Sequence, residues 1–228
     1  MEKTDYQKII DHILEEEKLE NLLPKFAEAE KACYNGDELG LANLVDFSTG
    51  IIWEYYAQKE IDSVVAIYER VRDAIEHSKY NKQVPFWREA VVKIYPQLAY
   101  AYMEQSEWGK ADTTVKQYVD YLDDFYNAPD ILEGERYKQF EIDNLFKTVE
   151  RLSKYYERID EIHRAVSCLS SISRFVNYDD EKLQFEYYAS LATLYHKAFH
   201  YSFNKAKENI DCLISESPVG LFGELHNK

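Results

Sequence analysis

The sequence predicts an all-α fold built from antiparallel helix hairpins, and three observations indicate it. Apolar and small side chains recur three, four and seven residues apart over most of the chain, which is the spacing of one helix face. Seven Gly and five Pro in 228 residues are few, which favours long helices with few turns. Apolar residues at 46% and charged residues at 30% are typical of a globular protein rather than a disordered one.

The clearest hairpin is predicted between Tyr95 and Tyr121, with its turn at residues 105–108. Its expected core positions are Tyr95, Leu98, Ala99 and Tyr102 in the first helix, then Ala111, Val115 and Tyr118 in the second. Two amphipathic helices joined by so short a turn are expected to pack against each other through these faces.

Four other segments repeat this register, which gives a single domain of about five hairpins over residues 1–228. The expected hairpins are 5–34, 38–78, 84–126, 135–176 and 180–216, followed by a tail at 217–228. The expected core positions of the other four are Ile9, Ile10, Ile13, Leu22, Phe26 and Ala29; Ile51, Ile52, Tyr55, Val64, Tyr68 and Val71; Leu152, Ser153, Tyr156, Ala165, Leu169 and Ile172; and Leu191, Ala192, Tyr195, Ala206, Ile210 and Leu213. Hairpins of this kind stack on their neighbours, and the stack curves into a superhelix with a concave inner surface.

Two prolines are expected to mark helix boundaries. Pro24 fits the start of a helix for which Asn21 is the N-cap. Pro96 lies inside an apparent helix that begins near Phe86, so a kink or a break between two helices is expected there.

The order of residue sizes in the hairpin at 95–121 resembles the tetratricopeptide repeat (TPR): a large residue, a large–small pair, an aromatic residue, then a small Ala that opens the second helix. Equivalent positions of successive hairpins lie between 39 residues (152 to 191) and 54 residues (98 to 152) apart, against about 34 in a standard repeat. The elongated hairpins resemble those of TPR-like peptide-sensing regulators of Gram-positive bacteria and their phages. Nothing in the first forty residues is typical of a basic recognition helix, so DNA binding is not expected.

The resemblance implies that the first helix of each hairpin lines a concave groove with the residues opposite its core positions. These include Trp53 and Tyr56 in the second hairpin, Lys93, Gln97, Tyr100 and Met103 in the third, and the smaller or polar Ala189, Thr193 and His196 in the fifth. Aromatic side chains in a groove are common anchors of an interface. The alternative is that they pack between successive hairpins.

A basic stripe is predicted in the fourth hairpin. Lys147, Arg151, Lys154 and Arg158 are spaced four, three and four residues apart, which places them on one helix face opposite the core. Such a stripe could bind a carboxylate or a run of acidic side chains. The alternative is a solvated face in which Glu150, Glu157 and Glu161 neutralise these bases.

These observations favour a non-catalytic module that binds a protein or peptide in the concave groove. The formal charge of −15 repels nucleic acid and anionic membranes, so neither is an expected partner. The same charge attracts basic proteins, which leaves two alternatives: an acidic inhibitory or immunity-type protein that neutralises a basic toxin or nuclease, and a structural subunit of a larger assembly. A homodimer is left open.

No catalytic activity, cofactor or metal is expected. His196 and His200 have the spacing of two metal ligands on a helix, but position 197 is Lys and no third ligand is evident. Three cysteines without CxxC spacing indicate free thiols in a reducing cytoplasm, and no segment approaches the ~20 apolar residues of a membrane span.

Overall fold

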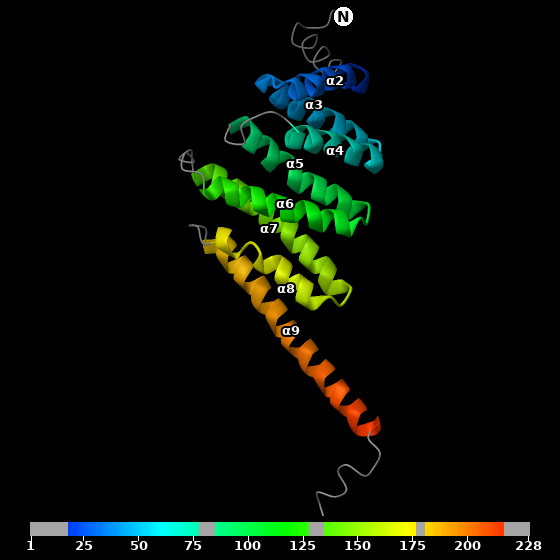
Figure 1. The fold of residues 1–228 in the computed structure, drawn as a ribbon, viewed down its shortest axis with the longest axis vertical. Helices are drawn as coiled ribbons and strands as arrows, with labels where there is room; N and C mark the ends of the chain where they lie inside the picture. Colours follow the sequence, from blue (N-terminus) through cyan, green and yellow to red (C-terminus); the bar gives the residue numbers. More distant parts are fainter. Residues whose placement is uncertain (1–17, 78–84, 128–134, 177–180, 217–228) are drawn as a thin grey trace, which may run out of the picture. The chain divides into compact units, whose positions relative to one another are not determined.

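The computed structural model describes residues 18–77, 85–127, 135–176 and 181–216, and all regular structure in these ranges is helical (Figure 1). The elements are α2 (Leu19–Asn35), α3 (Glu38–Ala57), α4 (Ile61–His77), α5 (Pro85–Glu104), α6 (Trp108–Asn127), α7 (Glu135–Arg158), α8 (Ile162–Ser170), the 3-10 helix η1 (Ser173–Phe175) and α9 (Glu181–Glu216). The predicted all-α fold is confirmed. The expected helix around Ile9–Ile13 and the tail at 217–228 lie outside the described residues.

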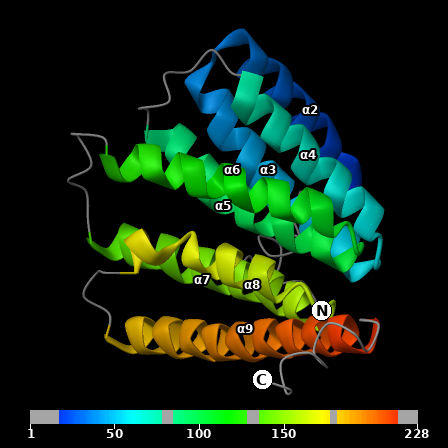
Figure 2. The same cartoon turned by 60° about the horizontal axis from the view of Figure 1, so that its bottom comes forward.

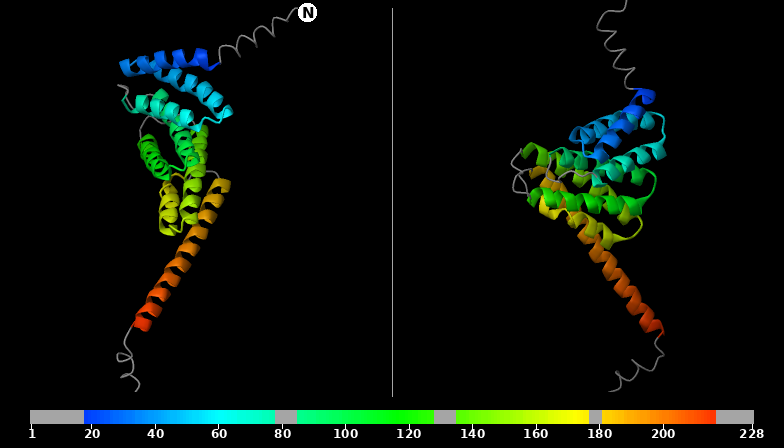
Figure 3. Two further views of the ribbon diagram at one scale, coloured as in Figure 1. Left: turned by 90° about the vertical axis from the view of Figure 1, so that its right-hand side faces the viewer. Right: turned by 45° about the horizontal axis from the view of Figure 1, so that its top comes forward.

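The chain forms two compact units, Met1–Thr148 and Val149–Lys228, with the boundary inside α7. In the first unit each helix from α2 to α6 packs against the next one along the chain (Figure 3). In addition, α3 packs against α5, and α2 packs against α4. The first helices of two successive hairpins, α3 and α5, are therefore neighbours, and so are the second helices α2 and α4. In the second unit α9 lies beside α8 (Figure 2).

The predicted core register is confirmed in the hairpins at 38–78, 84–126 and 135–176. Every expected core position there is buried except Tyr55, which is half-buried. Leu98 and Ala111 of one hairpin, and Leu152 and Ala165 of another, are each 0% exposed. The same holds for the second helix of the first hairpin, in which Leu22, Phe26 and Ala29 are buried.

One turn geometry closes these three hairpins. Lys59, Ser106 and Asp160 each adopt a left-handed conformation, with φ of 62°, 63° and 63°. Each is followed by a Glu whose backbone N–H donates to the carbonyl of a tyrosine five residues earlier: Glu60 to Tyr55 at 2.9 Å, Glu107 to Tyr102 at 2.8 Å and Glu161 to Tyr156 at 2.9 Å. This bond and the one from the left-handed residue form a Schellman motif, which satisfies carbonyls at the end of the first helix.

The predicted fifth hairpin is wrong, because residues 181–216 form one helix, α9, of 36 residues. The segment 196–205, where the turn was expected, contains no Gly, Pro, Asp or Glu. It therefore lacks both a helix breaker and the acidic residue that follows the left-handed position in the three turns above. The inner face of α9 is buried at Leu183, Tyr187, Leu194 and Ala198, and the Tyr187 hydroxyl donates to the Leu169 carbonyl of α8 at 3.2 Å.

Both prolines lie inside helices rather than at boundaries. α2 begins at Leu19 with Lys18 as its N-cap, so Pro24 lies within it and not at its start. α5 runs without a break through Pro96, and Tyr95 and Leu98 beside it are 0% exposed. The burial of these side chains holds α5 together although Pro96 lacks a backbone donor.

We expect Gly40→Ala to destabilise the first unit by about 1–3 kcal/mol. A Cβ at Gly40 would lie 2.7 Å from the backbone nitrogen of Cys33 and 2.9 Å from the carbonyl carbon of Ala32, so α3 would have to move away from α2. The free energy of unfolding in urea, followed by far-UV circular dichroism, measures the change. Gly109→Ala is the matched control, because a Cβ there meets nothing within 4 Å and should leave stability unchanged or slightly raised. Equal effects of the two variants would contradict close packing at Gly40.

Candidate functional site

Two aromatic residues occupy equivalent positions on the neighbouring helices α3 and α5. Trp53 lies two residues after the core residue Ile51, and Tyr100 lies two residues after the core residue Leu98. The Trp53 side chain is 75% exposed, and Tyr100 is half-buried. Because α3 packs against α5, these equivalent positions belong to one side of the first unit. We call Trp53, Tyr56, Lys93 and Tyr100 the α3–α5 face.

The other residues predicted to line this surface differ in exposure. Tyr56 is half-buried, and Lys93 is exposed with its Nζ 2.7 Å from Oε1 of Glu89. Met103 is only 3% exposed and belongs to the core, so its predicted place in the groove is corrected. It follows the core residue Ala99 by four positions, which places it on the buried side of α5.

The basic stripe of α7 is exposed at Lys147, Arg151, Lys154 and Arg158. The core positions Val149, Leu152 and Tyr156 of the same helix are buried, as the spacing predicts. Lys154 Nζ lies 2.8 Å from Oε1 of the half-buried Glu150, and a pair at this helical spacing is worth about 0.2–0.5 kcal/mol. For Lys154 this favours the alternative of a solvated, neutralised face.

The other two acids expected to neutralise the stripe bind cations elsewhere in the second unit. Glu157 pairs with Lys197 of α9, and Glu161 pairs with Arg164 of α8 at 2.6 Å. A cleft of about 340 Å³ between α7 and α9 is lined by Glu150, Lys154, Glu157 and Lys197, among others. Its acids and bases pair with one another, so its net electrostatic attraction for a ligand is weak.

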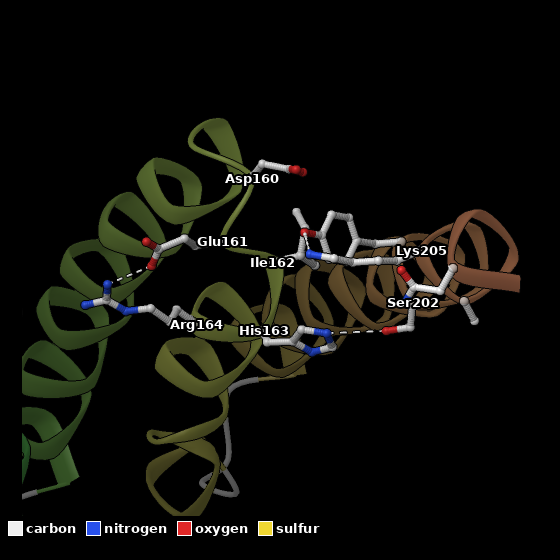
Figure 4. A pocket seen from close by; sticks show the side chains of 10 residues that line it. Asp160, Glu161, Ile162, His163, Arg164, Ser202 and Lys205 are labelled. Carbon is white, nitrogen blue, oxygen red and sulfur yellow. Dashed lines mark hydrogen bonds and ion pairs between the residues drawn. The ribbon is translucent and has the colours of Figure 1, made fainter. Parts of the chain in front are cut away.

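A second cleft, of about 710 Å³, lies between the start of α8 and α9 (Figure 4). His163 Nε2 lies 3.3 Å from the Ser202 hydroxyl, and Lys205 Nζ donates to the Tyr201 hydroxyl at 3.3 Å. The carboxylates of Asp160 and Glu161 point away from His163 in Figure 4. A base that activates a serine is usually oriented by a third group, and the residues drawn do not supply one.

The outer face of α9 exposes a row of aromatic side chains that the predicted fifth hairpin did not anticipate. We call it the α9 stripe: Phe185 at 75% exposure, Tyr188 at 47%, Tyr195 at 54%, Phe199 at 66% and Phe203 at 60%, together with the exposed Ala192. In the sequence, the three- and four-residue spacing of these side chains indicates that they share one helix face. Two of these residues, Ala192 and Tyr195, are predicted as core positions of the fifth hairpin, and that prediction is wrong because both are exposed.

His196 and His200 lie side by side on α9, and no third ligand joins them among the described residues. The rings of His196 and His200 lie 4.5 Å apart between centroids, at an angle of 77°. Within the described ranges, no group of three or more His, Cys, Asp and Glu side chains is placed to hold a metal ion. Cys33 is buried, and this burial, with the charge of Glu30, raises the pKa of its thiol to about 11, so it is a poor nucleophile at neutral pH.

Buried hydroxyls link α4 and α5. The Tyr102 hydroxyl donates to Glu69 Oε1 at 2.6 Å and accepts from Arg72 Nη1 at 3.4 Å, while the Tyr95 hydroxyl donates to Glu76 Oε1 at 2.8 Å. Burial, and then the bond to Glu69, raise the pKa of Tyr102 to about 12. The hydroxyl therefore stays protonated at neutral pH and serves as a structural donor.

No family model matches the chain, and no curated protein or solved structure matches it either. None of the helices in the described ranges combines the length and the apolar character that crossing a bilayer requires.

We expect Tyr102→Phe to destabilise the chain by about 1–2 kcal/mol, because it leaves the Glu69 carboxylate and an Arg72 donor without this partner. Urea unfolding of the purified variant measures the loss. Tyr34→Phe is the control, since this ring is 41% exposed and its hydroxyl can exchange with water at little cost. A Tyr102→Phe variant as stable as wild type would show that the hydrogen bonds of the Tyr102 hydroxyl contribute nothing to the free energy of unfolding.

Proposed function

We propose that this chain is a non-catalytic module that binds a protein or peptide through a TPR-like stack of helix hairpins. The observation that carries the proposal is the α3–α5 face, where a 75% exposed Trp53 and a half-buried Tyr100 occupy equivalent positions of successive hairpins. A residue repeated in register along neighbouring helices can contact successive side chains of an extended ligand.

The packing in the first unit supports the stacked arrangement. In helical solenoids, first helices pack on first helices and second helices on second helices, so that one layer faces the ligand. The contacts of α3 with α5 and of α2 with α4 have this order. The common turn at Lys59 and Ser106 supports it further, because equal turns give successive hairpins the same geometry.

The chemistry of the face favours a ligand with an apolar or aromatic anchor. Trp and Tyr are the side chains most often responsible for binding energy at interfaces. Burying the exposed three-quarters of Trp53 removes roughly 150 Å² or more of largely apolar area from water, a gross gain of about 4 kcal/mol. Association entropy offsets part of this gain.

The net charge adds a preference for the ligand's charge. At −15, the chain attracts ligands with a net positive charge and speeds their encounter at low salt. A basic peptide with an aromatic residue therefore fits both the long-range field and the exposed Trp53.

The test uses a peptide selected from a random-sequence display library on the immobilised wild-type chain. We expect Trp53→Ala to weaken binding of that peptide at least tenfold in titration calorimetry, because the main anchor is removed. The matched control is Tyr34→Ala, which removes a 41% exposed aromatic side chain of α2 outside the α3–α5 face and should leave affinity unchanged. A selected peptide that binds the Trp53→Ala variant as tightly as wild type would contradict this surface.

A further inference from the structure

The helix α9 is amphipathic in an unusual sense, because apolar side chains cover two separate faces of it. Its inner face packs on α8 through Leu183, Tyr187, Leu194 and Ala198. At about 100° per residue, the α9 stripe occupies an arc of about 80° centred roughly 130° away from that inner face. Exposed apolar surface of this extent and regularity marks an interaction site.

The spacing of the stripe is that of a coiled-coil seam. Its members from Phe185 to Phe199 follow one another at intervals of three, four, three and four residues: Phe185, Tyr188, Ala192, Tyr195 and Phe199. Apolar residues at these intervals form the a and d positions of a heptad, which bury themselves against a second helix. The occupant of this face is therefore expected to be a helix.

Charge favours a second copy of this chain as the source of that helix. Only Glu186, Lys197 and Lys205 are charged between residues 185 and 206, and helical spacing places all three outside the stripe. Two chains of charge −15 repel each other over most of their surface, so they can approach only where charge is absent. A basic partner would gain little from the stripe between residues 185 and 203, because no carboxylate lies on it there.

The exposed area is sufficient for such a pair. With about 200 Å² for each aromatic side chain, the exposed fractions of the five aromatic residues amount to roughly 600 Å² per chain. Two copies would bury roughly 1,200 Å², which reaches the lower end of the range for specific interfaces.

The order of residues along the stripe favours an antiparallel pair. Reversing one helix places Phe185 opposite Phe203, Tyr188 opposite Phe199, and the small Ala192 opposite the large Tyr195 of the second copy. The same alignment places Glu181 opposite Lys207, both of which are exposed, whereas a parallel pair would place Glu181 opposite Glu181. The arrangement is isologous, as a two-fold dimer requires.

We propose that two copies of this chain associate through the α9 stripe as an antiparallel two-helix coiled coil. The inference goes beyond the proposed function, because the α3–α5 face belongs to other helices.

Sedimentation velocity of the full chain, from low to high micromolar concentration, tests the association. We expect twice the chain mass for wild type, and for Phe199→Glu a dimer dissociation constant at least 100-fold higher, because two carboxylates would be buried in the seam. Asn204→Glu is the matched control: it adds the same charge on an exposed position of α9 outside the stripe and should remain dimeric. A wild-type monomer at all concentrations, or equal dissociation of the two variants, would overturn the proposal.

Further measurements distinguish loss of the contact between α9 helices from unfolding and from loss of peptide binding. Circular dichroism of the Phe199→Glu variant should match wild type, since the side chain is 66% exposed and no core contact is lost. The variant should still bind the library-selected peptide, whereas Trp53→Ala should still dimerise, so the two proposals fail independently. Glu181→Lys should weaken the dimer roughly threefold and added Lys207→Glu should restore it; no restoration would overturn the antiparallel orientation.

Discussion

The fold depends on burying one apolar face of each helix against the helices that neighbour it in the chain. A helix of 17 to 24 residues is only marginally stable alone in water, so this burial supplies most of its stability. The turn then decides which faces meet. In each of three hairpins, the tyrosine that accepts the turn hydrogen bond and a fully buried residue of the next helix are nine positions apart in the sequence: Tyr55 and Val64, Tyr102 and Ala111, Tyr156 and Ala165. Equal turns therefore produce equal core registers.

The hairpins at 38–78, 84–126 and 135–176 could be predicted from the sequence because burial imposes the helical spacing directly. The turns could be predicted less well, since the left-handed residues are Lys59, Ser106 and Asp160 rather than Gly. What they share is the Glu that follows, and the segment 196–205 has no acidic residue. Periodicity continues unchanged through a hairpin or a single long helix, so it could not distinguish α9 from two helices. The break predicted at Pro96 is absent because buried side chains before and after it, Tyr95 and Leu98, stabilise α5.

The exposure of a side chain follows from the core register of its own helix, whereas a contact between helices does not. The exposure of Trp53 and of the basic stripe of α7 follows from their positions opposite a core face. Ion pairs between helices do not follow from spacing: Glu157 binds Lys197, 40 residues away, instead of a base on its own helix. The exposure of the α9 stripe does not follow from spacing either. α9 has two apolar faces, and helical spacing does not distinguish the face that packs on α8 from the face that is exposed.

Charge and apolar area have opposite effects on where this chain can bind other molecules. Its excess of carboxylates keeps like molecules apart over long distances, while at contact each carboxylate that must be desolvated costs several kcal/mol. Dry contact is therefore easiest at exposed apolar side chains, and Trp53 and the α9 stripe are two such places. They differ in extent, since Trp53 offers a single anchor and the stripe offers a continuous row of aromatic side chains. A single anchor fits a short ligand that nearby charges select, whereas a row at heptad spacing fits a helix of the same length and pattern, and α9 itself is such a helix.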